Sequence, residues 1–283
     1  MRNKETRVAP SVRAALETAR YELLPTAKIE GAVLSNVPRT VTLTVTASPT
    51  KGIDATLDLA ERMIGHGYQV VPHLAARMIA GKSHLAEIVD RLTGLRVTNV
   101  FCPAGDQDPP AGEYHSSLPM LEHLTDMGRP FADIGITGYP ESHPAIDDDI
   151  TVQAMWDKRL HATYIVSNLC FDAAAIETWL RRMRRRDITL PVLIGMPGPV
   201  ERTKLLSMAT KIGVGQSARF LKQHAGAFAR IAAPGGFSPE RFLAGSAGYL
   251  ADPAMRVQGL HIFTFNQAAE TEAWRQGMLA RAA

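Results

Sequence analysis

Short β-rich apolar segments alternate with longer segments of helical period along this chain of 283 residues, and the alternation never breaks. This pattern is typical of βα units that build a parallel sheet. Eight apolar segments have the length and composition of strands: residues 19–24, 41–46, 69–72, 97–103, 132–137, 164–168, 191–194 and 260–264. Because eight parallel strands can close on themselves, the sequence predicts an α/β fold, a (β/α)8 TIM barrel.

The intervening segments place apolar residues at three- and four-residue spacing, as the outer helices of a barrel require. Clear examples are residues 55–66, 83–93, 118–127, 173–185 and 200–212. An open doubly wound sheet is the alternative, but no G-x-G-x-x-G motif follows the first predicted strand. Since neither an internal repeat nor a long linker interrupts the pattern, we expect one catalytic barrel domain over residues 19–283, preceded by an N-terminal extension over residues 1–18.

Composition narrows the class of protein. Hydrophobic residues make up 46% of the chain, enough for a large core, yet no apolar run reaches membrane-spanning length. The first 20 residues lack the apolar block of a signal peptide, so the sequence predicts a cytoplasmic protein. Cys102 and Cys170 both lie in apolar strand-like runs, which favours reduced core residues over a disulfide or a metal pair.

The charge pattern gives no sign of a nucleic-acid partner. The formal net charge is only +3, and the densest basic cluster, residues 181–186, ends a predicted helix without interleaved aromatic residues. Basic side chains in a last helical turn oppose the helix dipole favourably, or simply form a solvated face. We therefore expect small-molecule substrates, with neither nucleic acid nor membrane as partner.

Polar residues recur where the predicted strands end. Glu22 lies inside the first strand, where a carboxylate among apolar neighbours is either a functional acid or an ion-pair partner. Later strands are followed by Thr46, His73, Asp106, Tyr139 with His143, and Asn168. Each alone is more often a cap or a turn residue. Because the carboxyl ends of parallel strands meet at one end of a barrel, their joint occurrence predicts a binding site there.

The segment A-D-I-G-I-T-G-Y-P-E-S-H-P at residues 132–144 is the most informative of these strand ends. An apolar strand leads directly into a loop with Tyr, Glu and His, the layout of a ligand-binding loop, although a tight turn would have a similar composition. This stretch resembles the flavin-contacting loop of methylenetetrahydrofolate reductases, whose pattern is roughly G-(V/I)-A-G-Y-P-E-x-H-P.

The resemblance extends over residues 21–267, and its motifs occur in the family's order. Y-E-L-L-P at residues 21–25 resembles (F/Y)-E-(F/L)-x-P, and P-H-L-A-A at 72–76 resembles P-H-L-T-C. P-A-G-D at 103–106 resembles L-R-G-D, and S-N-L-C-F-D at 167–172 resembles T-Q-(L/F)-F-F-D. H-I-F-T-F-N-Q at 261–267 is similar to H-F-Y-T-L-N-R. Several motifs in order are stronger evidence than any one of them.

The resemblance implies a reaction and roles for residues. It implies reduction of 5,10-methylenetetrahydrofolate to 5-methyltetrahydrofolate with NADH or NADPH, as in one-carbon metabolism and methionine biosynthesis, or the reverse oxidation in a demethylation pathway. Glu22 would be the acid that protonates N10 of the folate, Asp106 would act beside the pterin, and Asn168 would replace a folate-binding Gln. The implied contacts to FAD come from Thr46, His73, Asp106, Tyr139, His143 and Lys158.

The departures from the family pattern affect mainly the residues that would contact the flavin. Ala104 replaces the Arg of L-R-G-D, and Asp157-Lys158 keeps one cation of a basic pair that grips the flavin pyrophosphate. Phe263 and Gln267 replace a Tyr and an Arg. Each lost charge-assisted contact is worth about 1.5 to 3 kcal/mol, so we expect FAD to bind weakly. Direct hydride transfer from NAD(P)H to the folate, without flavin, is the alternative.

Two functions of other kinds share parts of this pattern. A folate-dependent methyltransferase barrel would keep an acid near the pterin but would not need the loop with Tyr139 and His143. A non-catalytic folate- or flavin-binding subunit would not need Glu22. The sequence leaves open the choice of NADH or NADPH, the physiological direction and the oligomeric state, and a homo-oligomer is compatible with it.

Overall fold

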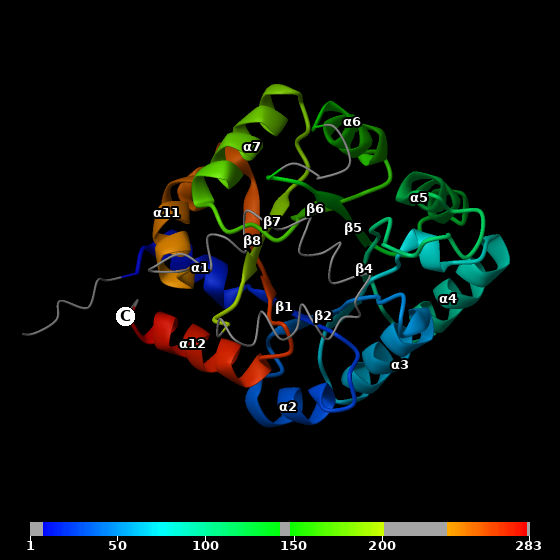
Figure 1. The fold of residues 1–283 in the computed structure, drawn as a ribbon, viewed down its shortest axis with the longest axis horizontal. Coiled ribbons are helices and arrows are strands. Elements are labelled where there is room, and N and C mark those ends of the chain that lie inside the picture. Colours follow the sequence, from blue (N-terminus) through cyan, green and yellow to red (C-terminus); the bar gives the residue numbers. More distant parts are fainter. Residues whose placement is uncertain (1–7, 142–147, 201–236, 282–283) are drawn as a thin grey trace, which may run out of the picture.

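A computed structural model describes residues 8–141, 148–200 and 237–281. Parallel strands alternate with helices, and the helices form a ring around the strands (Figure 1). The strands are β1 (Arg20–Leu23), β2 (Thr42–Val45), β3 (Val70–Pro72), β4 (Asn99–Phe101), β5 (Asp133–Gly138), β6 (Tyr164–Ser167), β7 (Val192–Pro197) and β8 (Val257–Phe263). Each overlaps one predicted segment, and the predicted (β/α)8 barrel is confirmed.

The helices are α1 (Pro10–Glu17), α2 (Ile29–Asn36), α3 (Gly52–Gly65), α4 (Lys82–Gly94), α5 (Ser117–Asp126), α6 (Asp148–Lys158), α7 (Ala173–Arg185), α11 (Pro239–Ala251) and α12 (Ala268–Ala280). Short 3-10 turns are η1 (Ala76–Met78) and η2 (Pro253–Met255). The helix predicted over residues 173–185 coincides with α7, while α3, α4 and α5 begin and end close to their predicted bounds. The helix predicted over residues 200–212 lies largely outside the described residues.

The strand order is β3-β2-β1-β8-β7-β6-β5-β4, so the barrel closes between β3 and β4. A single parallel bridge, His73 to Phe101, joins those two edges, and the amide of Leu74 donates to the carbonyl of Phe101 at 2.8 Å. The two edge strands share only this one bridge, because β3 and β4 are each only 3 residues long. His73 therefore lies where the two edges of the sheet meet.

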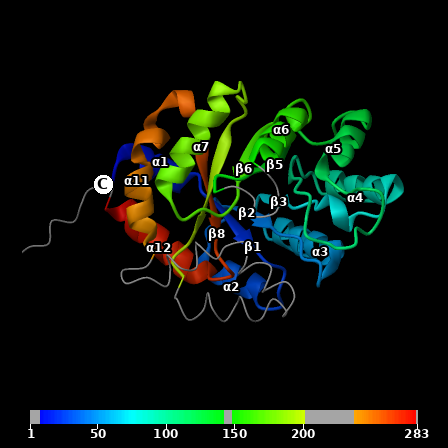
Figure 2. The ribbon, with the colours of Figure 1, turned by 45° about the horizontal axis from the view of Figure 1, so that its top comes forward.

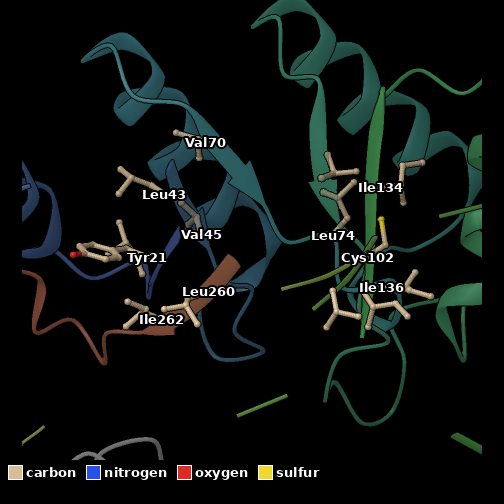
Figure 3. Packing of buried hydrophobic residues seen from close by; sticks show 14 of the residues in the cluster. Tyr21, Leu43, Val45, Val70, Leu74, Cys102, Ile134, Ile136, Leu260 and Ile262 are labelled. Atoms are coloured by element: carbon tan, nitrogen blue, oxygen red, sulfur yellow. The ribbon is translucent and has the colours of Figure 1, made fainter. Parts of the chain in front are cut away.

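Side-chain alternation separates an outer core from an inner one. Tyr21 and Leu23 of β1 are fully buried against the helices, whereas Arg20 and Glu22 alternate with them and face the barrel interior. The outer core joins all the strands to their helices, and Figure 3 shows its packing around Tyr21, Leu43, Val45, Leu74, Ile136, Leu260 and Ile262. The inner core is a separate cluster of Val71, Phe101, Tyr164, Val166 and Leu193.

A polar network fills the amino end of the interior. Arg20 donates to the hydroxyl of Tyr164 at 3.2 Å, and that hydroxyl donates to Asn99 Oδ1 at 2.8 Å. The guanidinium also lies 5.0 Å from the centre of the Tyr164 ring, and burial raises the pKa of the phenol to about 12. Since all three residues begin strands, this network closes the bottom of the barrel and leaves the carboxyl end for a ligand.

A buried ion pair fastens the last helix to the first strand. Glu272 and Arg275 of α12 are 4% and 5% exposed and form an ion pair at 3.0 Å. The hydroxyl of Tyr21 donates to Glu272 at 2.6 Å, and Arg275 also donates to the carbonyl of Leu16 in α1 at 3.1 Å. One network therefore connects α1, β1 and α12, which lie side by side in both ribbon views (Figures 1 and 2).

The cysteine prediction is confirmed, because Cys102 and Cys170 are both free and fully buried. Burial raises the pKa of the Cys102 thiol to about 12, so it stays protonated. Among the described helices, none has the length and apolar character needed to span a bilayer.

Candidate active site

Glu22 and His261 form the centre of the site. Strands β1 and β8 pair in a register that places Arg20 beside His261 and Glu22 beside Phe263, so the two inward side chains are diagonal neighbours. Glu22 Oε2 lies 3.1 Å from His261 Nε2. The Glu22 side chain is 15% exposed and that of His261 only 2%. The carboxyl group therefore reaches the barrel opening with the imidazole behind it.

The chain after β8 fixes the end of β1 that carries Glu22. Thr264 donates its hydroxyl to the carbonyl of Glu22 at 2.6 Å. Asn266 accepts from the amide of Leu24 at 2.8 Å and donates to the carbonyl of the same residue at 3.0 Å. Asn266 has φ 58, a left-handed conformation that Asn tolerates better than most residues. The H-I-F-T-F-N-Q motif thus supplies both the partner of Glu22 and its support.

His73 completes a buried group with these two residues. Its ring packs edge-on against Phe101 with centroids 4.7 Å apart, and its centroid is 6.2 Å from that of His261. Burial lowers the pKa of His73 to about 4, although the nearby Glu22 carboxylate opposes that effect, so the ring is neutral at physiological pH. Among the described residues, Nε2 of His73 has no hydrogen-bond partner although it is buried.

Asp106 and Tyr139 lie near each other on the loops after β4 and β5. Asp106 is exposed, and Tyr139 is half-buried. Burial, together with the negative charge of Asp106, raises the pKa of the Tyr139 phenol to about 12. The two loops therefore present a carboxylate and a protonated phenol at the same end of the barrel as Glu22.

Two more predicted residues lie at that end. The amide of Thr46, just after β2, donates to the carbonyl of Leu23 at 2.9 Å, which places Thr46 beside the end of β1. Asn168 follows β6, and its amide donates to the carbonyl of Gly138 at 2.7 Å. Its side-chain Oδ1 accepts from the amide of Leu169 at 2.9 Å, so this oxygen is held within its own turn.

Lys158 is a predicted residue that the structure does not bring to this group. Lys158 ends α6, the helix that leads into the amino end of β6, opposite the carboxyl ends of the strands. Burial lowers the pKa of its ammonium, and its electrostatic neighbours are Asp157 and Cys102. His143 lies outside the described residues.

These positions fit one part of a flavin better than another. Asp106, Tyr139 and the unpartnered nitrogen of His73 are suited to hydrogen bonding with the edge of an isoalloxazine ring. The residues that the family pattern assigns to the flavin pyrophosphate suit it poorly. Ala104 is uncharged, Asp157 is acidic, and Lys158 ends α6 near the amino end of β6. The described residues thus match the ring, whereas the positions that the family pattern assigns to the pyrophosphate place no cation at this end of the barrel.

His261 is the site residue that the sequence prediction omitted. It is the first residue of the H-I-F-T-F-N-Q motif, for which the resemblance implies no role. The available signal was the two-residue alternation of a strand, which places His261 and Phe263 on one face of β8. With β8 next to β1, that face points toward Glu22.

The fold and the site together define a TIM-barrel protein whose acidic and imidazole groups gather at the carboxyl ends of the strands. The sequence pattern of the methylenetetrahydrofolate reductase family matches residues 27–222, more than half of the chain. The chain belongs to this family, which supports a folate-related reductase function in general terms.

Solved structures of similar shape include enzymes of other kinds. A putative lyase/mutase from Burkholderia cenocepacia J2315 is 18% identical, with 87% of this chain and 97% of that chain covered and a TM-score of 0.45. An oxaloacetate acetylhydrolase is 11% identical, covering 85% and 94%, with a TM-score of 0.48. A 2,3-dimethylmalate lyase is 13% identical, covering 88% and 94%, with a TM-score of 0.45.

Proposed function

We propose that this protein catalyses hydride transfer between a nicotinamide nucleotide and the bridging carbon of 5,10-methylenetetrahydrofolate, giving 5-methyltetrahydrofolate, with Glu22 as general acid. Family membership supports the reaction class. The hydrogen bond between Glu22 and His261 at the barrel opening is the observation that carries the assignment of the acid. In the reverse direction, the same pair would accept the proton.

Glu22 and His261 can share one proton, and Glu22 can transfer it to a ligand. Either the imidazole donates to the carboxylate, or a protonated carboxyl group donates to the imidazole, and both arrangements use Glu22 Oε2 and His261 Nε2. Opening the methylene bridge to the reactive iminium requires a proton on the leaving nitrogen, and a positioned acid supplies it. Glu22 is the exposed member and faces the folate, while His261 shares the charge left behind.

A bound flavin would supply a hydride relay between nucleotide and folate. Asp106 and Tyr139 would hydrogen-bond the ring edge, and the chain contributes little to the pyrophosphate. We therefore propose weak FAD binding, with direct transfer from NADH or NADPH as the alternative when flavin is absent. Asp106 would also accept hydrogen bonds from the donor-rich edge of the pterin.

A spectrum and an assay test the proposal together. The purified protein is examined for a flavin band near about 450 nm and then assayed anaerobically for NAD(P)H oxidation that depends on 5,10-methylenetetrahydrofolate. We expect substrate-dependent oxidation, enhanced by added FAD. Absence of oxidation with both nucleotides, with and without FAD, would eliminate the reductase and leave the methyltransferase and the non-catalytic subunit.

Asp106→Asn is expected to weaken the binding of 5-methyltetrahydrofolate by about 1 to 3 kcal/mol, because one acceptor of a bidentate contact becomes a donor. Isothermal titration measures the effect. Asp108→Asn, an exposed carboxylate in the same loop that pairs with Arg77, is the control and should leave folate affinity unchanged. If Asp106 only caps its loop, Asn would serve nearly as well, and an unchanged dissociation constant would refute the ligand role.

Ala104→Arg is expected to tighten FAD binding by about tenfold, the equivalent of about 1.4 kcal/mol, by restoring one contact to the pyrophosphate. Fluorescence quenching during titration with FAD measures the affinity. Ala111→Arg adds the same charge at an exposed position of the same loop and should change the affinity much less. Tight binding by the unaltered chain would show that other residues replace the missing cations.

A further inference from the structure

Glu22, His73 and His261 form a compact set of potential metal ligands inside the barrel. One ligand atom from each residue can be chosen so that all three lie within 4.8 Å of one another. They come from β1, from its neighbour β8, and from the residue that follows β3, which is two strands away from β1 in the sheet. Two imidazoles with one carboxylate is a donor set typical of zinc and of other divalent transition metals.

Hydrogen bonding within the described chain does not fully account for this set. The buried Nε2 of His73 has no partner among the described residues. A buried polar atom without a partner costs free energy, and a bound ion is one of the recognised explanations. The hydrogen bond between Glu22 and His261 gives no partner to Nε2 of His73.

The ligand atoms lie near one another but are not yet at bonding positions around one ion. Ligand atoms that are each about 2.1 Å from one ion at tetrahedral angles lie about 3.4 Å apart, so groups that now lie within 4.8 Å of one another would need to approach by up to about 1.4 Å. Glu22 can supply part of this movement, because its side chain is 15% exposed, whereas the two histidines are buried.

We propose that Glu22, His73 and His261 bind one divalent transition-metal ion of the Zn²⁺ type. Binding replaces the proton shared by Glu22 and His261 with the metal. Metal binding itself does not depend on the proposed reductase function. One consequence does rest on that function: the metal occupies the carboxylate that serves as general acid, so Zn²⁺ should inhibit folate reduction reversibly.

Cobalt substitution tests the site without an activity assay. The full chain is treated with chelator, dialysed and titrated with Co²⁺, whose visible d–d absorption reports coordination by protein ligands. We expect one Co²⁺ per chain, displaced by Zn²⁺. Glu22→Gln, His73→Gln and His261→Gln should each weaken Co²⁺ binding by at least about tenfold, since even loss of a group that only supports a ligand commonly costs about 10- to 100-fold.

A surface pair provides a matched control. His66 Nε2 lies 2.9 Å from Glu30 Oε1, a contact of the same kind between side chains that are 40% and 28% exposed. His66→Gln should bind Co²⁺ as the unaltered chain does. Circular dichroism checks that each variant folds, and Glu22→Gln, which changes the most exposed ligand, provides the test if a histidine variant does not fold.

The outcomes separate the metal site from the reductase. The metal site would be overturned if the unaltered chain showed no Co²⁺ bands. It would also be overturned if all three ligand variants bound Co²⁺ with the same affinity as the unaltered chain, or if His66→Gln lost Co²⁺ binding. Site-specific Co²⁺ binding without any reductase activity would support the metal site and refute the proposed function. Reductase activity in a chain that binds no metal would do the reverse.

Discussion

Glu22→Gln is expected to lower the rate of folate reduction by about two orders of magnitude or more, the usual contribution of a general acid. The amide keeps the size of the side chain and can still hydrogen-bond to His261, but it has no proton to give to the leaving nitrogen. Folate binding and the fold should change little. Any bound flavin should still be reduced by NAD(P)H, because that step needs no proton from Glu22.

Stopped-flow measurement separates the two half-reactions of the Glu22→Gln variant, and turnover with NAD(P)H covers the case without flavin. Glu17→Gln is the control, because Glu17 forms only an exposed ion pair with Arg13 in α1. Near-normal folate turnover in Glu22→Gln would remove Glu22 from the role of acid. Equal losses of flavin reduction and folate reduction would point instead to a general disturbance of the site.

The sequence was sufficient to predict the barrel because its strands are buried on both faces. Segments such as residues 132–137 and 164–168 are short apolar runs between strongly periodic helices, and both became strands. The residues that follow parallel strands share one end of the barrel by topology alone, so Asp106 after β4 and Tyr139 after β5 are expected at the same end. Their proximity in the structure follows from the pairing of β4 with β5.

Other features depend on contacts that no local pattern encodes. Helix α2 was absent from the predicted helices, because it has only 8 residues and its apolar positions give no clear one-sided stripe. The pairing of Glu22 with His261 joins residues 239 positions apart and depends on the register between β1 and β8. The position of His73 where the barrel closes likewise depends on which two strands form the edges of the sheet. Register and closure are properties of the assembled sheet.

The second large effect concerns stability. Glu272→Ala is expected to lower the free energy of unfolding by about 3 to 5 kcal/mol, because it leaves the guanidinium of Arg275 in the core without its carboxylate. The change also removes the acceptor of the Tyr21 hydroxyl, which lies 2.6 Å from Glu272 Oε2. Urea unfolding followed by tryptophan fluorescence measures the loss. Glu177→Ala breaks an exposed pair with Arg181 and should cost no more than about 0.5 kcal/mol.

The contribution of Glu272 should also depend on pH in a defined direction. Burial alone would raise the pKa of this carboxyl group, but hydrogen bonds from Arg275 and Tyr21 outweigh burial and lower it. A carboxyl group whose pKa is lower in the folded state stabilises the protein above its unfolded pKa, about 4.3 for Glu, and loses that contribution as the pH falls through the folded value. The stability difference between the unaltered chain and Glu272→Ala should therefore be constant near neutral pH and shrink below about pH 4. A difference that stays constant to lower pH would show that packing around the side chain, and not its charge, provides the stabilisation.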